Sequence, residues 1–513
     1  MNRNSTIRCL ATAASIGCLG TAEITVADSV IDTSAFTEAV TTDATLLHLQ
    51  AFQQFSDENG GNREASSDGF FESVKYVSNL MAQAGYDVNL QLFPYIFFEN
   101  RTEPVLDQIS PEAVTYVLNE LDGFGTMTYS GSGDVTAIAE AVDIQSPPGE
   151  EPNSSTSGCE ESDFEGFTAG NIAIIQRGSC TFALKAANAE AAGAAGVVIF
   201  NEGQEGRQDA FGATLGGSGI SIPVVGTSFA IGETLAAGDV EIHLAVDAVT
   251  EVRISTNVIA DSPVGREDKV LVVGAHLDSV PEGPGINDNG SGSAGILEIA
   301  LQLSQLGFLA DEEEGLRNQV RFAWWGAEEE GLLGSEYYVS QLSEEELGRI
   351  ALNLNFDMIA SPNYARFVYD GDGSASEMAG PEGSSFIEWV FNEHFAARGL
   401  ITEPTAFDGR SDYGPFIEAG VPAGGLFTGA EGIKTADQAG IYGGTAEEAY
   451  DSCYHAECDT IENVNLQALD EMTDAAAHAV MLFGMKNLPE PAERGKRSAN
   501  SVAMDYKGNH LIR

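Results

Sequence analysis

Histidine and carboxylate side chains occur at spacings from which they could hold divalent metal ions. The stretch from Val270 to Gly292, VLVVGAHLDSVPEGPGINDNGSG, delivers His276 and Asp288 after an apolar run. Asp278 lies two residues beyond His276, and residues two apart on an extended chain point the same way. Asp278 can therefore hold one ring nitrogen of His276 while the other nitrogen faces a metal. These residues predict one half of a metal site.

Further potential ligands follow later in the chain. Glu329 comes shortly after a strand predicted for Gln319 to Trp325, and Asp357 follows another predicted strand, Ala351 to Phe356. A mostly parallel sheet gathers its ligand sites at the carboxyl ends of its strands. Two imidazoles and three carboxylates suit two Zn²⁺ ions that share one carboxylate. The candidate metal ligands are His276, Asp288, Glu329, Asp357 and His455.

The elements around these residues predict an α/β fold. Val270 to Val273 is an unbroken apolar run, typical of a strand buried on both faces of a parallel sheet. A glycine- and proline-rich loop carries Asp288, and the helix predicted after it has Ile296, Ala300 and Leu303 on one face. We therefore expect a mostly parallel mixed sheet flanked by helices.

The first part of the chain fits the same fold class. Residues 36–98 predict a helix, a loop, a second helix and a strand. Asp68 is the expected cap of the second helix, Gly69 to Ala84, and the alternating stretch Tyr86 to Phe93 is the expected strand.

Residues 100–250 differ in character, with short predicted strands, many glycines and no candidate metal cluster. Within them, Ile172 to Gln176, Phe182 to Ala192 and Val197 to Phe200 predict a strand, a helix and a strand. The stretches DFEGFTAGNIAIIQRGSC, KAANAEAAGAAGVVIFN and SIPVVGTS resemble the protease-associated (PA) domain. The resemblance implies a β-rich α/β module without catalytic residues, inserted into a peptidase.

Length and charge limit the possible functions. A chain of 513 residues is long enough for two domains. With 78 acidic and 24 basic residues the formal net charge is -54, so a phosphate backbone would be repelled and nucleic acid is not an expected partner. The acidic excess fits adaptation to salt, or simply a soluble extracellular protein, and the sequence leaves both interpretations open.

The N-terminus predicts export. Arg3 and Arg8 precede a short stretch of small apolar residues, Cys9 to Ala22, so residues 1–27 are the expected signal peptide. The protein is then secreted to the extracellular space or the periplasm. No later stretch approaches the ~20 apolar residues that span a membrane, so no membrane span is expected.

Four cysteines remain after the predicted signal peptide. An even number in an exported chain predicts two disulfides. Proximity in the sequence pairs Cys159 with Cys180 and Cys453 with Cys458. The alternative is four free thiols, which export disfavours.

The motifs GAHLDSV, GINDNGSG, WWGAEEEGLLGS, NFDMIASPN, GRSDYGPF and YHAECDTIENVN resemble those of the secreted two-zinc leucyl aminopeptidase family of metallopeptidases. The resemblance implies a zinc-exopeptidase (phosphorylase/hydrolase-like) fold. It also implies a peptidase domain in two parts, residues 36–99 and 251–487, around the inserted domain at 100–250. Residues 488–513 would be a C-terminal tail.

The resemblance implies a role for each candidate ligand. Asp288 would bridge two zinc ions. His276 and Asp357 would complete the coordination of one ion, and Glu329 and His455 that of the other.

The resemblance also implies the catalytic and substrate-binding residues. Glu328 would be the general base that takes a proton from the zinc-activated water, and Tyr454 would hydrogen-bond the developing oxyanion. Arg410 would lie near the substrate, and Met358 and Phe427 would line an apolar pocket. The implied reaction removes large apolar residues, such as leucine, from peptide N-termini.

One departure from the family pattern affects this assignment. The family usually has a leucine after its pair of glutamates, where this chain has Glu330. The register favours Glu328 as base and Glu329 as ligand, and a shift by one residue stays open.

Three further possibilities remain. Asp470 and Asp474 match family positions near a structural calcium ion. Arg410 is the one cation expected near the site, and a carboxypeptidase or dipeptidase of the same superfamily would need such cations to hold the substrate's α-carboxylate. A non-catalytic binding protein on this fold would lack ligands, and none is missing here. The oligomeric state is left open.

Overall fold

The computed structural model describes residues 31–217, 219–310, 315–376 and 378–488. The predicted signal peptide, residues 1–27, and residues 489–513 of the predicted tail lie outside the described residues. The described residues form two large β-sheets, each with eight strands. No helix in this part of the chain combines the length and apolarity that a membrane crossing requires.

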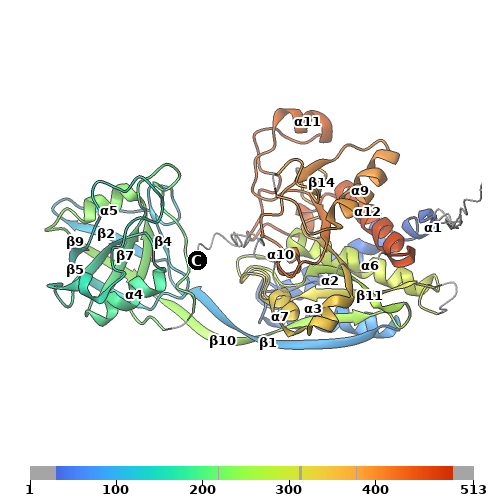
Figure 1. Cartoon of the computed structure of the whole chain (residues 1–513), viewed down its shortest axis with the longest axis horizontal. Coiled ribbons are helices and arrows are strands. Elements are labelled where there is room, and N and C mark those ends of the chain that lie inside the picture. Colours follow the sequence, from blue (N-terminus) through green and yellow to red (C-terminus); the bar gives the residue numbers. More distant parts are fainter. Residues whose placement is uncertain (1–30, 218, 311–314, 377, 489–513) are drawn as a thin grey trace, which may run out of the picture. The chain divides into compact units, whose positions relative to one another are not determined.

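The first sheet is mixed, and its centre is parallel (Figure 1). Strand β11 pairs in parallel with β12 and β13, and β13 pairs in parallel with β16. Strand β10 pairs antiparallel with β1 and β12, whereas β14 pairs antiparallel with β16 and in parallel with β15. The order across the sheet is β1 (Asp87–Asn100), β10 (Ala248–Asp261), β12 (Asn318–Trp325), β11 (Arg266–His276), β13 (Ile350–Phe356), β16 (Ala423–Phe427), β14 (Phe367–Tyr369) and β15 (Glu403–Thr405).

Helices cover both faces of this sheet because the side chains of its central strand alternate between two apolar cores. Leu271 and Val273 of β11 pack in one core, and Val270 and Val272 pack in the other. The first core also takes side chains from α1 (Ser34–Thr37), α2 (Thr42–Glu58), α3 (Asp68–Gln83), α6 (Gly292–Gln305), α9 (Ser384–Ala397) and α12 (Leu466–Met485). The second takes them from α7 (Leu333–Gln341), α8 (Glu344–Arg349) and α10 (Tyr413–Glu418).

This arrangement confirms the expected fold class. It also shows that the two parts of the predicted peptidase domain, residues 36–99 and 251–487, share one apolar core, since α2 and α3 pack with β11.

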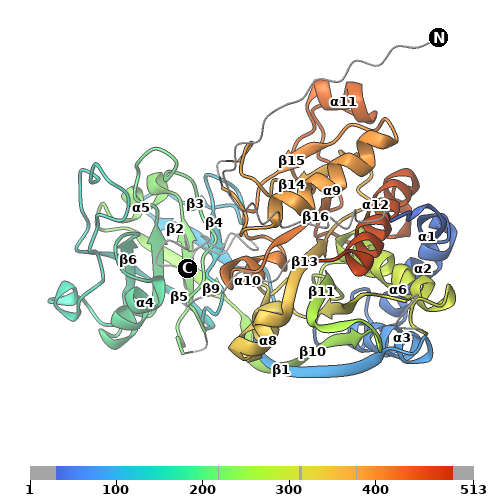
Figure 2. The same ribbon diagram turned by 45° about the vertical axis from the view of Figure 1, so that its right-hand side comes forward.

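The second sheet lies between β1 and β10 in the sequence. Helices α4 (Phe182–Ala191) and α5 (Phe229–Leu235) contribute to the two apolar cores on its faces (Figure 2). The strand–helix–strand unit predicted around α4 is present. The strand order is β3 (Val114–Thr115), β2 (Val105–Ser110), β9 (Glu241–Val246), β5 (Gly133–Val142), β6 (Ile172–Gln176), β7 (Gly196–Phe200), β8 (Val224–Thr227) and β4 (Phe124–Thr126).

Two details of the N-terminal prediction were wrong. Ser67 caps α3, because its side-chain oxygen accepts a hydrogen bond from the N–H of Phe70 at 3.1 Å, and Asp68 is the first helical residue. Strand β1 continues beyond Phe93 to Asn100, because it pairs with β10 along its whole length. Long-range pairing thus sets the end of β1, and local alternation does not reveal it.

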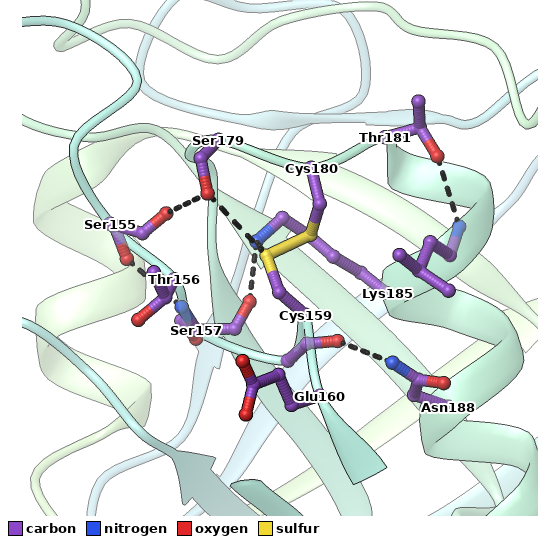
Figure 3. Close-up of a disulfide and its surroundings, with 12 residues drawn as sticks. Ser155, Thr156, Ser157, Cys159, Glu160, Ser179, Cys180, Thr181, Lys185 and Asn188 are labelled. Carbon is purple, nitrogen blue, oxygen red and sulfur yellow. Dashed lines mark hydrogen bonds between the residues drawn. A yellow bond between two sulfur atoms is a disulfide. The ribbon is translucent and has the colours of Figure 1, made fainter.

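Both expected cysteine pairs are disulfides in the structure. Cys159 is bonded to Cys180, which joins the segment before the 3₁₀ helix η1 (Glu161–Phe164) to the segment before α4 (Figure 3). Cys453 is bonded to Cys458, and this bond closes a short loop near the end of the chain.

Candidate active site

Three of the candidate ligands lie at one edge of the first sheet. His276 is the last residue of β11, Glu329 follows the end of β12, and Asp357 directly follows β13. Because these three strands are parallel neighbours, their carboxyl ends meet at the same edge. The continuous apolar strands therefore position polar side chains where each strand ends.

The other two candidate ligands come from loops. Asp288 lies in the segment η2 (Ile286–Ser291), which leads directly into α6, and its own backbone there is not helical (φ -106°, ψ 95°). His455 lies in the loop between α11 (Ala436–Tyr442) and the 3₁₀ helix η3 (Ile461–Asn463). The structure thus brings all five predicted ligands together from separate parts of the sequence.

Asp288 lies between the two imidazoles. Its Oδ1 atom is 3.2 Å from Nε2 of His276, and its Oδ2 atom is 3.2 Å from Nε2 of His455. Asp357 places Oδ1 3.4 Å from Nε2 of His276, and Glu329 places Oε2 3.0 Å from Nε2 of His455. Each imidazole therefore has one carboxylate of its own, and both share Asp288.

The donor set fits a pair of metal ions. Oδ1 of Asp357 and Oε1 of Glu329 are buried and have no hydrogen-bond partner among the described residues. Buried carboxylate oxygens without a partner are costly, and a bound cation would satisfy them. Burial lowers the pKa of His455, but Glu329 and Asp288 outweigh burial and raise that pKa to about 11. The cluster thus concentrates negative charge, as imidazole and carboxylate sites for Zn²⁺ do.

Asp278 supports the cluster in a different way from the one expected. Nδ1 of His276 lies 3.2 Å from the backbone oxygen of Asp278 and 3.7 Å from its carboxylate. The contact with the imidazole is thus made mainly by the backbone. The carboxylate accepts hydrogen bonds from the backbone N–H groups of Glu328 at 3.2 Å and Glu329 at 3.3 Å. It therefore fixes the turn that carries both glutamates.

The three consecutive glutamates have different surroundings. Oε2 of Glu328 lies 3.9 Å from Nε2 of His276, and burial raises the pKa of Glu328 well above its usual value. Glu329 contacts His455, as described above. Glu330 lines a different hollow, and burial and the neighbouring Glu64 raise its pKa well above the usual value. This arrangement supports the register in which Glu328 is free to act as a base.

A cleft opens beside the cluster. Its wall includes Met358, Tyr369 and Phe427, and it also includes Arg410 and Tyr454. The site therefore offers apolar surface next to the candidate ligands. All five residues that the sequence predicted for catalysis or substrate binding outside the ligand set, including Glu328, line this one cleft.

Tyr454 is held in place on two sides. An Nη atom of Arg410 donates a hydrogen bond to the phenolic oxygen of Tyr454 at 3.1 Å. The ring of Tyr454 stacks on His455 with 3.8 Å between ring centroids. Burial raises the pKa of Tyr454, so the phenol keeps its proton at neutral pH and can donate it in a hydrogen bond.

Backbone conformation near the ligands could not be predicted from residue type. Ala327, Met358 and His455 have φ of 55°, 50° and 54°, in the left-handed region that non-glycine residues seldom adopt. Such residues gather at functional sites, where the surrounding structure enforces them. Met358 follows the candidate ligand Asp357, His455 is itself a candidate ligand, and Ala327 directly precedes Glu328.

Ser411 is a site residue that the sequence analysis did not identify. Its hydroxyl donates a hydrogen bond to Oδ2 of Asp357 at 2.5 Å, and Nδ2 of Asn355 donates to the Ser411 oxygen at 2.8 Å. The Oδ1 atom of Asp357 remains directed at the imidazole. Ser411 lies within the GRSDYGPF motif, and a serine there carries no signal of its own.

The expected calcium positions have other partners. Asp470 accepts a hydrogen bond from the hydroxyl of Thr42 at 2.5 Å. Asp474 lies 2.8 Å from the guanidinium of Arg398 and 2.8 Å from Nε2 of His394. The guanidinium of Arg398 already neutralises Asp474, so calcium stays a prediction without support from this geometry.

Comparison with known families agrees with the geometry. The sequence model of peptidase family M28 matches residues 257–480, and that of the PA domain matches residues 140–235. Both matches fall inside the expected ranges 251–487 and 100–250. The domain boundaries themselves remain predictions.

Relatives match over most of the chain. An aminopeptidase of Pseudomonas aeruginosa is 47% identical over 432 residues, which is 84% of this chain and 78% of that protein. Leucine aminopeptidase 2 of Trichophyton tonsurans is 39% identical over 460 residues, or 88% of this chain and 86% of that protein.

Solved structures show the same fold. The aminopeptidase from Aneurinibacillus sp. strain AM-1 has a TM-score of 0.65 and 26% identity, covering 90% of this chain and 98% of that one. BSAP, a zinc aminopeptidase from Bacillus subtilis, has a TM-score of 0.56 and 27% identity, covering 87% and 96%. The chain therefore belongs to peptidase family M28, a family of enzymes that hydrolyse peptide bonds, and it carries a PA domain.

Proposed function

We propose that this chain is an exported aminopeptidase that removes large apolar residues from peptide N-termini at a two-zinc centre. The observation that carries the proposal is the position of Asp288, whose two carboxylate oxygens each lie 3.2 Å from one imidazole nitrogen beside an open cleft. The names of the relatives, aminopeptidase and leucine aminopeptidase, support the same activity.

The five ligands divide naturally between two ions. His276 and Asp357 would hold one zinc ion, His455 and Glu329 the other, and Asp288 would bridge them. Bound zinc would polarise the scissile carbonyl and lower the pKa of an attacking water.

Glu328 is the proposed general base. Its carboxylate lies beside the ligand cluster and lines the cleft, and it is not needed to complete either ligand group. It would take a proton from the attacking water and deliver it to the leaving amine. Burial raises its pKa, which brings the group closer to the pH at which both transfers must occur.

The substrate would be held by groups on the cleft wall. Glu328 and Asp357 are the proposed partners of the free N-terminal ammonium. Tyr454 would donate its phenolic hydrogen to the oxyanion that develops on the scissile carbonyl. Met358 and Phe427 would contact the first side chain, and their apolar surface supports a preference for residues such as leucine.

The contacts of Arg410 disfavour a carboxypeptidase. That reaction needs a cation available for the substrate's α-carboxylate. Nη1 of Arg410 donates to Glu431 at 2.7 Å, and Nη2 donates to Tyr454 at 3.1 Å. Among the described residues that line the cleft, Arg410 is the only lysine or arginine. The charge of Arg410 is already neutralised by Glu431, so this cation is not available for a substrate carboxylate.

Export remains part of the proposal because the predicted signal peptide lies outside the described residues. The two disulfides support it, since such bonds persist mainly in oxidising compartments.

Matched chromogenic substrates test the proposed activity. Leucyl-p-nitroanilide, N-acetyl-leucyl-p-nitroanilide and glutamyl-p-nitroanilide differ only in the free amine or in the first side chain. We expect rapid cleavage of the first, none of the acetylated compound and a much lower kcat/KM for the glutamyl compound. Cleavage of the acetylated substrate at a comparable rate would refute the aminopeptidase proposal, and preference for glutamate would refute the apolar pocket.

A further inference from the structure

A buried carboxylate outside the proposed ligand set grips the segment that carries Asp288. Oδ1 of Asp459 accepts the backbone N–H of Asn287 at 2.9 Å, and Oδ2 accepts the backbone N–H of Asp288 at 3.0 Å. The backbone oxygen of Asp459 accepts the N–H of Ile286 at 3.0 Å. Asp459 is 1% exposed, so three consecutive N–H groups depend on this one residue in a site shielded from water.

Asp459 also belongs to the loop that carries His455. It follows Cys458 directly, and the disulfide to Cys453 closes the loop around His455. The backbone N–H of Asp459 donates to the oxygen of Ala456 at 3.0 Å, which ties it further to that loop. The residue therefore joins the segment of one proposed ligand to the segment of another.

Asn287 extends the connection to the segment after β13. Its Nδ2 donates to Asp451 at 2.7 Å and to the hydroxyl of Ser361 at 3.1 Å. Its Oδ1 accepts the backbone N–H of Ala360 at 3.1 Å, three residues beyond Asp357. Three ligand-bearing segments thus meet in one network of hydrogen bonds around the Asn287 side chain and the Asp459 carboxylate.

We propose that Asp459 is a positioning residue for the metal centre, and that it fixes Asp288 relative to His455 by holding the backbone of both ligand segments. The inference rests on the proposed two-zinc function. Residues that orient metal ligands typically change metal affinity by 10- to 100-fold when altered. Asp459 would act in this way through the backbone of the bridging ligand, without touching substrate.

A purely structural role would give a different result. Glu202 offers a matched control, because it is 0% exposed and its carboxylate accepts the backbone N–H of Asn153 at 2.9 Å within the PA domain. Glu202→Gln and Asp459→Asn each replace a buried carboxylate by an amide of the same shape. Both should lower the free energy of unfolding, and only the second should change zinc binding.

The experiment measures zinc dissociation constants of the full-length wild type and both variants by competition with a chromogenic chelator. Thermal unfolding is recorded on the same samples. We expect Asp459→Asn to bind zinc about 10- to 100-fold more weakly than wild type, and Glu202→Gln to bind as wild type does. Excess zinc should restore most of the kcat of Asp459→Asn, because its five ligands are intact.

Zinc affinity of Asp459→Asn equal to that of wild type would overturn the inference, as would an equal loss in both variants. If Asp459→Asn does not fold, Asp451→Asn replaces it, since Asp451 accepts Nδ2 of both Asn287 and Asn463. A reduced zinc affinity is again the expected result, and an unchanged affinity the contrary one. A wild type that binds no zinc would instead refute the proposed function.

Discussion

The guanidinium of Arg410 donates a hydrogen bond to the phenolic oxygen of Tyr454 at 3.1 Å. The same guanidinium pairs with Glu431 at 2.7 Å, so a carboxylate also fixes its position. Because Arg410 uses the oxygen of Tyr454 as an acceptor, the phenolic hydrogen is left free to donate to another group, and Tyr454 lines the cleft. Arg410 thus orients a donor, in addition to any contact it makes with substrate.

Tyr454→Phe removes that donor and little else. We expect kcat for leucyl-p-nitroanilide to fall by about 10²–10³, the usual loss for one oxyanion donor, with a small change in KM. Tyr116→Phe is a suitable control, because its hydroxyl donates to Gln108 at 3.2 Å away from the cleft. A variant of Tyr454 with the kcat of wild type would exclude the proposed role.

Glu328→Gln tests the general base. The amide cannot accept a proton, so kcat should fall by about 10²–10⁴ while two zinc ions remain bound. Glu330→Gln is the matched control, because the pKa of Glu330 is raised by burial and an amide resembles its protonated form. Near-complete loss of activity in Glu330→Gln, with activity retained in Glu328→Gln, would exclude Glu328 as the base and favour the register shifted by one residue.

Metal-free protein should become less stable as pH rises from 6 to 9. In that form the pKa of His455 is raised from 6.5 to about 11, against the effect of burial, by Glu329 and Asp288. The stabilisation from its bound proton is complete below 6.5 and is lost as pH rises through 11. Burial raises the pKa of Glu328 in the folded state, which adds a loss of the same sign.

Zinc-loaded protein should resist this change, because zinc binds deprotonated imidazole and its affinity increases with pH. Calorimetric Tm values with chelator and with zinc, at four pH values between 6 and 9, would measure both slopes. A metal-free Tm that increases across this window contradicts the prediction.

The two disulfides should differ in how much they contribute to stability and to zinc affinity. Cys453 and Cys458 enclose His455 and Tyr454 and lie 5 residues apart, whereas Cys159 and Cys180 lie 21 apart in the PA domain. Loop-closure entropy suggests stabilisation of about 2 kcal/mol for the shorter loop and about 3 kcal/mol for the longer.

Replacing each pair by serines should therefore cost more unfolding free energy at the Cys159 pair and more zinc affinity at the Cys453 pair. Urea unfolding and chelator competition on the two double variants provide the comparison. Equal zinc affinity in both double variants would mean that the short loop holds His455 in place without the disulfide.

Much of the site was predictable because strand ends carry a clear signal. Apolar runs followed by histidine or carboxylate residues predicted the positions of His276, Glu329 and Asp357 on a parallel sheet. Asp288 and His455 lie in loops; their residue types and positions made them candidates, and the resemblance to a known family implied the role of each. The structure places all five within one cluster.

Other features depend on contacts between distant segments and leave no mark in residue type. The carboxylate of Asp278 holds backbone N–H groups of the glutamate turn, and Ser411 holds Asp357. Asp459 similarly binds the backbone of Asp288 across 171 residues of sequence. An aspartate or serine in a polar loop has many ordinary roles, so residue type alone does not reveal these contacts.

Zinc titration of metal-free enzyme tests the central claim most directly. Activity on leucyl-p-nitroanilide and bound zinc would be followed together as zinc is added to wild type and to Glu328→Gln. The two-zinc account predicts that wild-type activity increases until two equivalents are bound, and that Glu328→Gln binds the same two equivalents with little activity. Full wild-type activity without added metal, or at a single bound equivalent, would contradict it.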